Sequence, residues 1–174
     1  MDYFAKIHFN GDFRDYQQRV LDNADNYLKD GKINVVAAPG SGKTVLGLEL
    51  ICRLGSPCII LSPTTAIRQQ WGERFRDLFL DDKEDFSTLF STDLHDVKLI
   101  NSVTYQALYS AIEKVRDDDL QDDCSDIDVI EIMKRFGIKT ICLDEAHHLR
   151  NEWQKALEKF IELLDKNVKI ISLT

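Results

Sequence analysis

The sequence predicts an α/β domain: a three-layer sandwich with helices on both faces of a mostly parallel central sheet. Two observations favour this class. Short apolar runs with little polar alternation recur along the 174 residues, as expected of strands that are buried on both faces. Longer stretches of helical periodicity separate these runs, and strand–helix alternation of this kind folds by right-handed crossovers into a parallel sheet.

The apolar runs predict the strands, and the periodic stretches between them predict the helices. The strands are expected at "INVVAA" (33–38), "CIILS" (58–62), "VKLINSV" (97–103), "KTICLDE" (139–145) and "VKIISLT" (168–174). The helices are expected over residues 14–30, 43–54, 65–79, 104–116, 127–136 and 151–165. Gly31, Gly55 and Gly137 stand where three of these helices should end, because glycine readily adopts the left-handed conformation that closes a helix.

The composition is ordinary for a globular protein, with 44% hydrophobic and 30% charged residues. Apolar runs are too short to cross a membrane, and residues 1–10 do not have the pattern of a signal peptide, so we expect a cytoplasmic protein. The net charge of −8 gives no support to nucleic-acid binding, which favours a basic face.

An acidic segment at about 116–128 accounts for most of this charge. It holds seven aspartates between Asp117 and Asp128, without which the chain would be close to neutral. The spacing lacks the glycine turn and the final glutamate of a calcium loop. We therefore interpret the segment as a solvated surface insertion.

The cysteines give no sign of a metal site. The four are Cys52, Cys58, Cys124 and Cys142, and they form no CxxC pair, so a zinc site is not expected. Cys58 and Cys142 lie within apolar runs and are predicted to be small core residues.

The stretch "AAPGSGKT" (37–44) lies between a predicted strand and a predicted helix, which is the context of a phosphate-binding P-loop. Gly40 and Gly42 allow backbone N–H groups to turn towards phosphate oxygens. Lys43 should reach the β- and γ-phosphates, and the Thr44 hydroxyl should bind Mg²⁺. Ala37 replaces the usual first glycine of the motif. The alternative is a plain glycine turn, which the Gly-Lys-Thr sequence disfavours.

The stretch "LDEAHH" (143–148) begins at the end of a predicted strand, where a parallel sheet presents its ligand-binding edge. Two adjacent carboxylates there can serve different roles in the reaction. Asp144 would hold Mg²⁺ through water, and Glu145 would polarise the attacking water and take its proton. The alternative is a solvated carboxylate pair at a helix start, which the P-loop about 100 residues upstream makes less attractive.

Together, "APGSGKT" and "DEAHH" resemble the motifs of superfamily 2 helicases and translocases of the DEAH-bearing branch. Further stretches resemble that family in its order: "FRDYQQRV" (13–20) its adenine-recognition segment, "LSPTTAIRQQW" (61–71) its motif Ia, "NSVTYQAL" (101–108) its threonine motif and "ISLT" its motif III. The chain is most similar to the XPB-like group and the type III restriction enzyme helicase subunits (ResIII).

The resemblance implies the first RecA-like domain, a P-loop NTPase fold, of an ATP-dependent DNA or RNA helicase or translocase, with DNA favoured over RNA. Mg²⁺ and ATP would be its cofactors. The implied catalytic residues are Lys43, Asp144 and Glu145, and Thr44 and Asp144 would serve the metal. The implied ATP-binding residues are Arg14, Gln17, Pro39, Gly40, Ser41, Gly42, Lys43 and Thr44, with Gln17 reading the adenine edge.

The resemblance also assigns residues to nucleic acid and to coupling. The nucleic-acid set is Pro63, Thr64, Thr65, Arg68, Val103 and Thr104. Threonine hydroxyls suit phosphate contacts, although Thr64 and Thr65 can equally cap the helix that follows, and the two roles are compatible. His147 would couple the ATP site to motif III through Thr174. Trp71 is expected to be a core residue rather than a base-stacking platform.

We expect residues 1–174 to be this one domain, cut within motif III, with a second RecA-like domain in the parent chain. That domain would supply an arginine finger, so the fragment alone should hydrolyse ATP poorly. Two alternatives remain: a P-loop ATPase of another class, and a nucleotide-binding scaffold that does not act on nucleic acid. The upstream "RDYQ" disfavours the first, and the intact set of Lys43, Thr44, Asp144 and Glu145 disfavours the second.

Overall fold

The computed structural model describes residues 3–114 and 124–174, and shows a six-stranded sheet in which each strand pair is parallel. The strand order is β1-β6-β5-β2-β4-β3. The strands are β1 (Lys32–Val35), β2 (Cys58–Ser62), β3 (Phe90–Ser91), β4 (Ile100–Thr104), β5 (Thr140–Asp144) and β6 (Lys169–Leu173). The predicted α/β class with a parallel sheet is confirmed.

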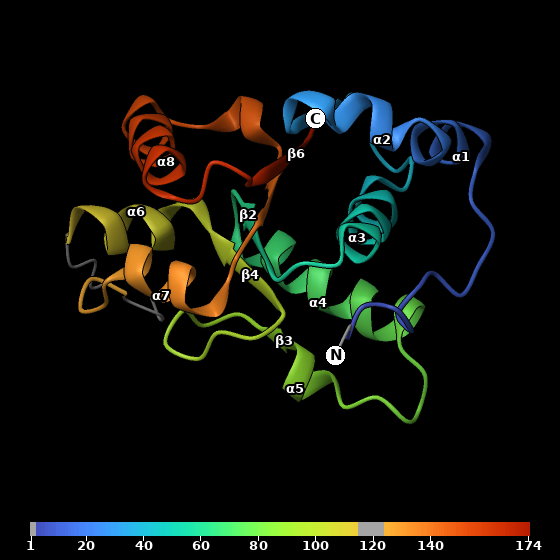
Figure 1. Cartoon of the computed structure of the whole chain (residues 1–174), viewed down its shortest axis with the longest axis horizontal. Helices are drawn as coiled ribbons and strands as arrows, with labels where there is room; N and C mark the ends of the chain where they lie inside the picture. Colours follow the sequence, from blue (N-terminus) through green and yellow to red (C-terminus); the bar gives the residue numbers. More distant parts are fainter. Residues whose placement is uncertain (1–2, 115–123) are drawn as a thin grey trace.

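Helices cover both faces of the sheet (Figure 1). One layer holds α1 (Asp15–Asp22), α2 (Ala24–Tyr27), α3 (Lys43–Leu54) and α4 (Thr65–Phe79), and the other holds α6 (Tyr105–Glu113), α7 (Val129–Phe136) and α8 (Asn151–Leu163). The short α5 (Phe86–Leu89) precedes β3, and two 3₁₀ turns are η1 (Leu28–Asp30) and η2 (Ala146–His148). Within the described residues, none of the helices has the length and apolar character needed to span a membrane.

The strands are buried on both faces, which explains their lack of polar alternation. In β2, Cys58 and Ile60 pack in the core beneath α3 and α4, while Ile59 and Leu61 pack in the core beneath α6, α7 and α8. Successive side chains of a strand point to opposite faces, so one strand contributes to both cores. Cys58 and Cys142 are fully buried, as predicted.

The first helix is shorter than predicted. Instead of one helix over residues 14–30, α1 ends at Asp22, and α2 and η1 follow. The break lies at Asn23, whose backbone leaves the helical conformation and whose Nδ2 donates to the Arg19 carbonyl at 2.8 Å. Asparagine competes in this way for backbone groups that a helix would otherwise use. Gly31, Gly55 and Gly137 each have positive φ where the preceding helix ends, as expected.

Other boundaries differ near the edge of the sheet. β4 begins at Ile100 rather than at residue 97, because the Asn101 side chain bonds to both the N–H and the carbonyl of Lys98 and closes a turn there. β3 lies in a region without a clear pattern, since a two-residue strand is too short to show one. Residues 115–123 of the acidic segment are outside the described residues.

Candidate functional site

The loop between β1 and α3 carries the "APGSG" part of the motif, and both of its glycines have positive φ, Gly40 at 74° and Gly42 at 91°. These left-handed conformations favour glycine, and Gly42 begins α3 as its N-terminal cap. A Cβ at Gly42 would lie 2.5 Å from Nε2 of Gln17, whereas one at Gly40 would meet nothing within 4 Å. Position 42 therefore requires glycine for both conformation and space.

Side chains at the start of α1 hold this loop through three consecutive carbonyl groups. Nη1 of Arg14 donates to the Gly40 carbonyl at 3.1 Å, the Tyr16 hydroxyl to that of Ser41 at 2.7 Å, and Nε2 of Gln17 to that of Gly42 at 2.9 Å. The Gln17 amide is buried, and its oxygen accepts the Arg14 N–H at 2.7 Å. The "RDYQ" stretch thus braces the phosphate loop, a structural contact that its adenine-reading interpretation did not foresee.

Asp144, the last residue of β5, is a buried carboxylate with two aromatic neighbours. The Trp71 indole N–H donates to its Oδ2 at 2.9 Å, and the Tyr105 hydroxyl donates to its backbone carbonyl at 3.0 Å. Burial is the main reason that the pKa of Asp144 is raised, and the charge of Glu145 adds to this; the Trp71 hydrogen bond and Lys43 oppose it. Trp71 is fully buried, so the expected core role is confirmed, but its N–H also fixes this carboxylate.

Glu145 follows in a left-handed conformation, with φ of 51°, that non-glycine residues seldom adopt. Its Oε1 lies 2.8 Å from Nζ of Lys43, and its Oε2 lies 3.3 Å from Nε2 of His147. Lys43 and Glu145 are separated by 102 residues in sequence. The fold therefore brings the phosphate-loop lysine and the strand-end acid into one ion pair.

A cleft of about 510 Å³ lies between the phosphate loop, the acid pair and α4. Nine of the predicted residues line it: Arg14, Gln17, Pro39, Gly40, Gly42, Lys43, Thr44, Asp144 and Glu145. Its far wall, which sequence reasoning missed, includes Ile67, Gln70, Arg74 and Leu78 of α4. These four residues recur at helical spacing and so share one face of α4, and this spacing was the sequence signal that could have predicted the wall. Phe9 and Asp12 also line the cleft and had no signal in the sequence.

The residues assigned to motif Ia lie where β2 gives way to α4. Pro63 is half-buried, and Thr64 and Thr65 are exposed. The Thr64 hydroxyl accepts the Ile67 N–H at 3.2 Å, so it caps α4. The guanidinium-bearing Arg68 is buried against the sheet, one turn into the helix. Exposed threonines at this position leave a polar surface beside the cleft.

Val103 and Thr104, assigned to the same role, are buried at 1% and 5% exposure. The Thr104 hydroxyl accepts the Ala107 N–H at 3.1 Å and caps α6. Their side chains therefore pack within the domain, and the exposed part of the predicted polymer contact is confined to the start of α4.

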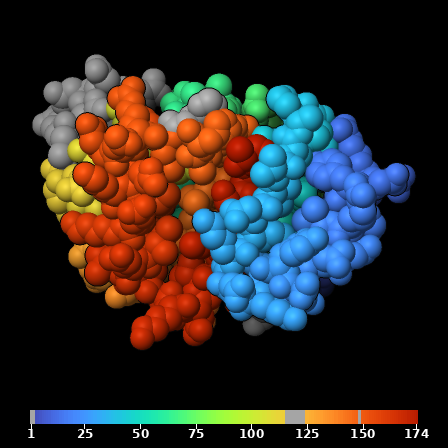
Figure 2. Space-filling view, turned by 90° about the horizontal axis from the view of Figure 1, so that it is seen from above, coloured from blue at the N-terminus to red at the C-terminus, as the bar shows by residue number. Residues whose placement is uncertain are grey.

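The end of β6 lies between the phosphate loop and the segment that carries Asp144 and Glu145. The Thr174 N–H donates to the Val35 carbonyl at 2.9 Å, and the Ala37 N–H donates to the Thr174 carbonyl at 3.0 Å. On the other side, the Glu145 N–H donates to the Leu173 carbonyl at 2.9 Å. Figure 2 shows the last residues, in dark red, emerging between light-blue and orange segments. The His147 side chain contacts Glu145, with Nε2 at 3.3 Å from Oε2.

A family model described as the type III restriction enzyme, res subunit (ResIII), matches residues 10–174. The chain belongs to the ResIII family. No match was found among curated proteins. ResIII membership implies a helicase-type ATPase motor domain with a RecA-like fold, in agreement with the parallel sheet and the site described above.

Proposed function

We propose that this chain is the N-terminal motor domain of an ATP-dependent helicase or translocase of the DEAH-bearing branch, which binds Mg-ATP in the cleft and a nucleic-acid backbone beside it. The observation that carries the proposal is the 2.8 Å contact between Lys43 and Glu145. It joins a glycine-rich loop at a helix N-terminus to a carboxylate pair at a strand end. This combination suits phosphoryl transfer from a bound nucleotide.

The cleft offers a group for each part of Mg-ATP. Loop N–H groups at the start of α3 and the Lys43 ammonium suit the phosphates. The hydroxyl of Thr44 and the carboxylate of Asp144 would hold Mg²⁺, which neutralises charge developing on the phosphate oxygens. Arg14 and Gln17 line the cleft beside the loop, where adenine would lie.

The ion pair suggests how nucleotide binding prepares hydrolysis. Lys43 cannot serve a γ-phosphate and Glu145 equally well, so binding would draw its ammonium away from the carboxylate. Glu145 would then be released to polarise water as the general base. The contact of His147 with Glu145 would change when Lys43 moves away from the carboxylate. A second RecA-like domain would supply the opposite wall and an arginine finger.

Contact with nucleic acid is best supported at Pro63, Thr64 and Thr65. They are at the carboxyl edge of the sheet, at the start of the helix that forms the far wall of the cleft. The hydroxyl groups of Thr64 and Thr65 are neutral donors, which suit contacts to phosphate that carry no sequence information. We assign DNA as the preferred polymer, with Arg68, Val103 and Thr104 supporting this surface from within the domain.

The first test is nucleotide binding by the whole chain. The second is ATP hydrolysis, with duplex DNA, single-stranded DNA or RNA added, by a protein that also contains the proposed second RecA-like domain. Lys43→Ala should weaken ATP binding about 10- to 100-fold, because a charge-assisted hydrogen bond to phosphate contributes about 1.5–3 kcal/mol. Lys32→Ala, at an exposed site on β1, is the matched control and should bind normally.

Stimulation of hydrolysis by one polymer, lost with Lys43→Ala, would support the motor. Hydrolysis that ignores all three polymers would point to another class of P-loop ATPase. Equal ATP binding by the Lys43→Ala and Lys32→Ala variants would refute the nucleotide site itself.

A further inference from the structure

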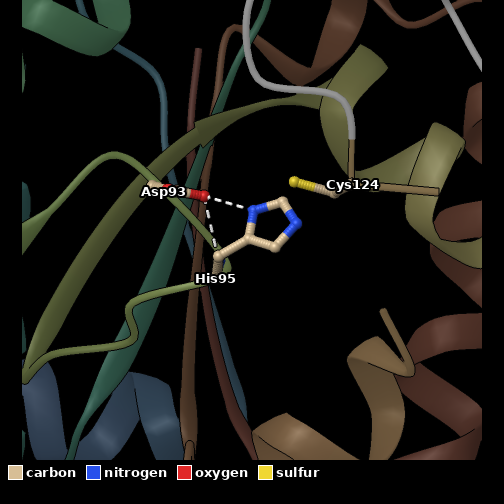
Figure 3. A group of neighbouring side chains, drawn as sticks. All are labelled: Asp93, His95 and Cys124. Atoms are coloured by element: carbon tan, nitrogen blue, oxygen red, sulfur yellow. Dashed lines mark hydrogen bonds and ion pairs between the residues drawn. The ribbon is translucent and has the colours of Figure 1, made fainter. Parts of the chain in front are cut away.

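A second group of ligating side chains lies near the opposite edge of the sheet from β1. Asp93 and His95 lie in the loop after β3, and Cys124 lies just before α7. Their carboxylate oxygen, ring nitrogen and sulfur all lie within 4.8 Å of one another. Figure 3 shows the three side chains converging from two separate chain segments.

The imidazole of His95 is held between two carboxylates. Oδ1 of Asp93 lies 2.7 Å from Nδ1 and also accepts the His95 backbone N–H at 2.9 Å. Oδ1 of Asp126 lies 2.8 Å from Nε2. The ring is therefore fixed in orientation, with one nitrogen on the side of Asp93 and the other on the side of Asp126.

The two segments are anchored in the core beneath. Leu94 and Val97 of the loop are buried in the same apolar cluster as Cys124. At the end of β3, the Ser91 hydroxyl accepts the Asp93 N–H and donates to the Asp93 carbonyl, both at 3.0 Å. Cys124 is 1% exposed, whereas the Asp93 and His95 side chains reach solvent. An ion could therefore reach these side chains from the solvent side.

We propose that Asp93, His95 and Cys124 bind a divalent transition-metal ion, with zinc as the preferred one. Thiolate, imidazole and carboxylate together form a set that suits zinc, whereas the sulfur is unsuited to calcium or magnesium. The ion would be bound through Nδ1, and Nε2–H would donate to Asp126. A carboxylate on the remote nitrogen is the usual means of orienting a metal-bound histidine.

Binding an ion would require the Asp93 and His95 side chains to separate slightly. Adjacent oxygen and nitrogen ligands of a tetrahedral zinc ion lie about 3.3 Å apart, so the contact between Asp93 and Nδ1 would open by about half an ångström. Metal would then replace the proton that the two atoms share. Water can fill the fourth position on the exposed side. The bound ion would fasten the loop after β3 to the start of α7, a structural role separate from the ATP cleft.

This grouping also explains why the cysteine pattern did not predict it. The side chains come in two pairs with one residue between members, Asp93 with His95 and Cys124 with Asp126. A search for CxxC cannot find such a set, because only one cysteine takes part and the pairs meet only in the folded chain.

The test is titration of the chelator-treated whole chain with cobalt(II), followed by displacement with zinc. We expect one cobalt ion per chain to produce a thiolate-to-metal charge-transfer band, which zinc abolishes. Cys124→Ser should remove the band, and Asp93→Asn should weaken cobalt binding at least tenfold. Asp96→Asn is the matched control, since it removes a negative charge from the same loop at a residue that instead pairs with Lys98.

A second measurement does not depend on replacing the buried cysteine. Zinc should raise the Tm of the wild-type chain, because an ion that binds only the folded state stabilises it. The substitution His95→Gln, at an exposed position, should abolish this rise in Tm and leave the metal-free Tm nearly unchanged. The proposal would be overturned if the wild-type chain showed no charge-transfer band, or if the band survived Cys124→Ser. It would also be overturned if Asp93→Asn and Asp96→Asn lost the same cobalt affinity.

Discussion

The cleft beside the phosphate loop and the Asp93–His95–Cys124 cluster differ in what holds their charged groups in place. In the cleft, Lys43 and Glu145 follow strands β1 and β5, and backbone hydrogen bonds to β6 fix both strand ends. In the cluster, Asp93 and His95 lie in a loop and are fixed largely by each other and by Asp126. A site built on strand ends has its geometry before any ligand arrives. A site built on loops gains much of its rigidity from the ion that it binds.

The largest loss of stability should come from Gly42→Ala, which disturbs the preformed geometry of the cleft. It places a Cβ 2.5 Å from the buried Gln17 amide at a φ of 91°. Backbone strain and the displaced amide together should cost about 2–4 kcal/mol of unfolding free energy and abolish nucleotide binding. Gly40→Ala, which meets no neighbour within 4 Å, should show only the strain, about 1–2 kcal/mol. Denaturant unfolding of both variants measures this difference in stability. Equal losses of unfolding free energy would contradict the prediction.

The next effect should come from Trp71→Phe, which removes the indole donor from Asp144. The buried carboxylate loses a hydrogen bond and the core loses volume, so the unfolding free energy should fall by about 2–4 kcal/mol. The matched control is Trp153→Phe, at a half-buried site where the ring lies against Arg150. Urea titration should show a clearly smaller loss for the control. If both variants lose the same stability, the Trp71–Asp144 contact contributes little.

A smaller change in stability is expected of Glu145→Gln, which breaks the ion pair of the cleft. The Lys43 and Glu145 side chains are 13% and 26% exposed, so solvent screening limits the cost to about 1 kcal/mol. If the proposed function holds, ATP affinity should rise up to about fivefold because Lys43 no longer has to leave a carboxylate, and ATP hydrolysis should be lost. Equilibrium binding of a fluorescent ATP analogue checks this. Weaker binding would show that Glu145 helps to hold the nucleotide.

The smallest effect should be that of His95→Gln measured without metal. The contacts of His95 with Asp93 and Asp126 are partly exposed, so their loss should cost about 0.5 kcal/mol or less. Differential scanning calorimetry after chelation tests this directly. A large loss in the absence of metal would mean that the loop is already rigid, and the contrast between the two regions would then fail.

The sequence predicted the parts of the cleft that lie within short motifs. Gly40, Gly42 and Lys43 follow from one loop, and Asp144 and Glu145 from one strand end, because such chemistry needs neighbouring residues at fixed spacing. The same reasoning placed α3 and α4 with their observed boundaries, since glycine and threonine mark their ends.

What the sequence did not predict depends on contacts between distant segments. The bond from Trp71 to Asp144 joins residues 73 positions apart, and neither residue type indicates the other. Arg74 lines the cleft only because α4 turns that face towards the phosphate loop. Thr104 resembled a phosphate contact, yet its burial and its capping bond follow from the packing of α6 against β4. Motifs report local chemistry, whereas exposure is a property of the whole fold.

The position of β6 between β1 and β5 sets the distance across the candidate site. Neighbouring strands lie about 4.8 Å apart, so one intervening strand sets the phosphate loop and the acid pair roughly 10 Å apart. Only long side chains can close that gap, and Lys43 and Glu145 do so together. Since backbone pairing defines this interval, replacing the Lys43 or Glu145 side chain would change the groups that face the cleft without changing the spacing of the strands beneath them.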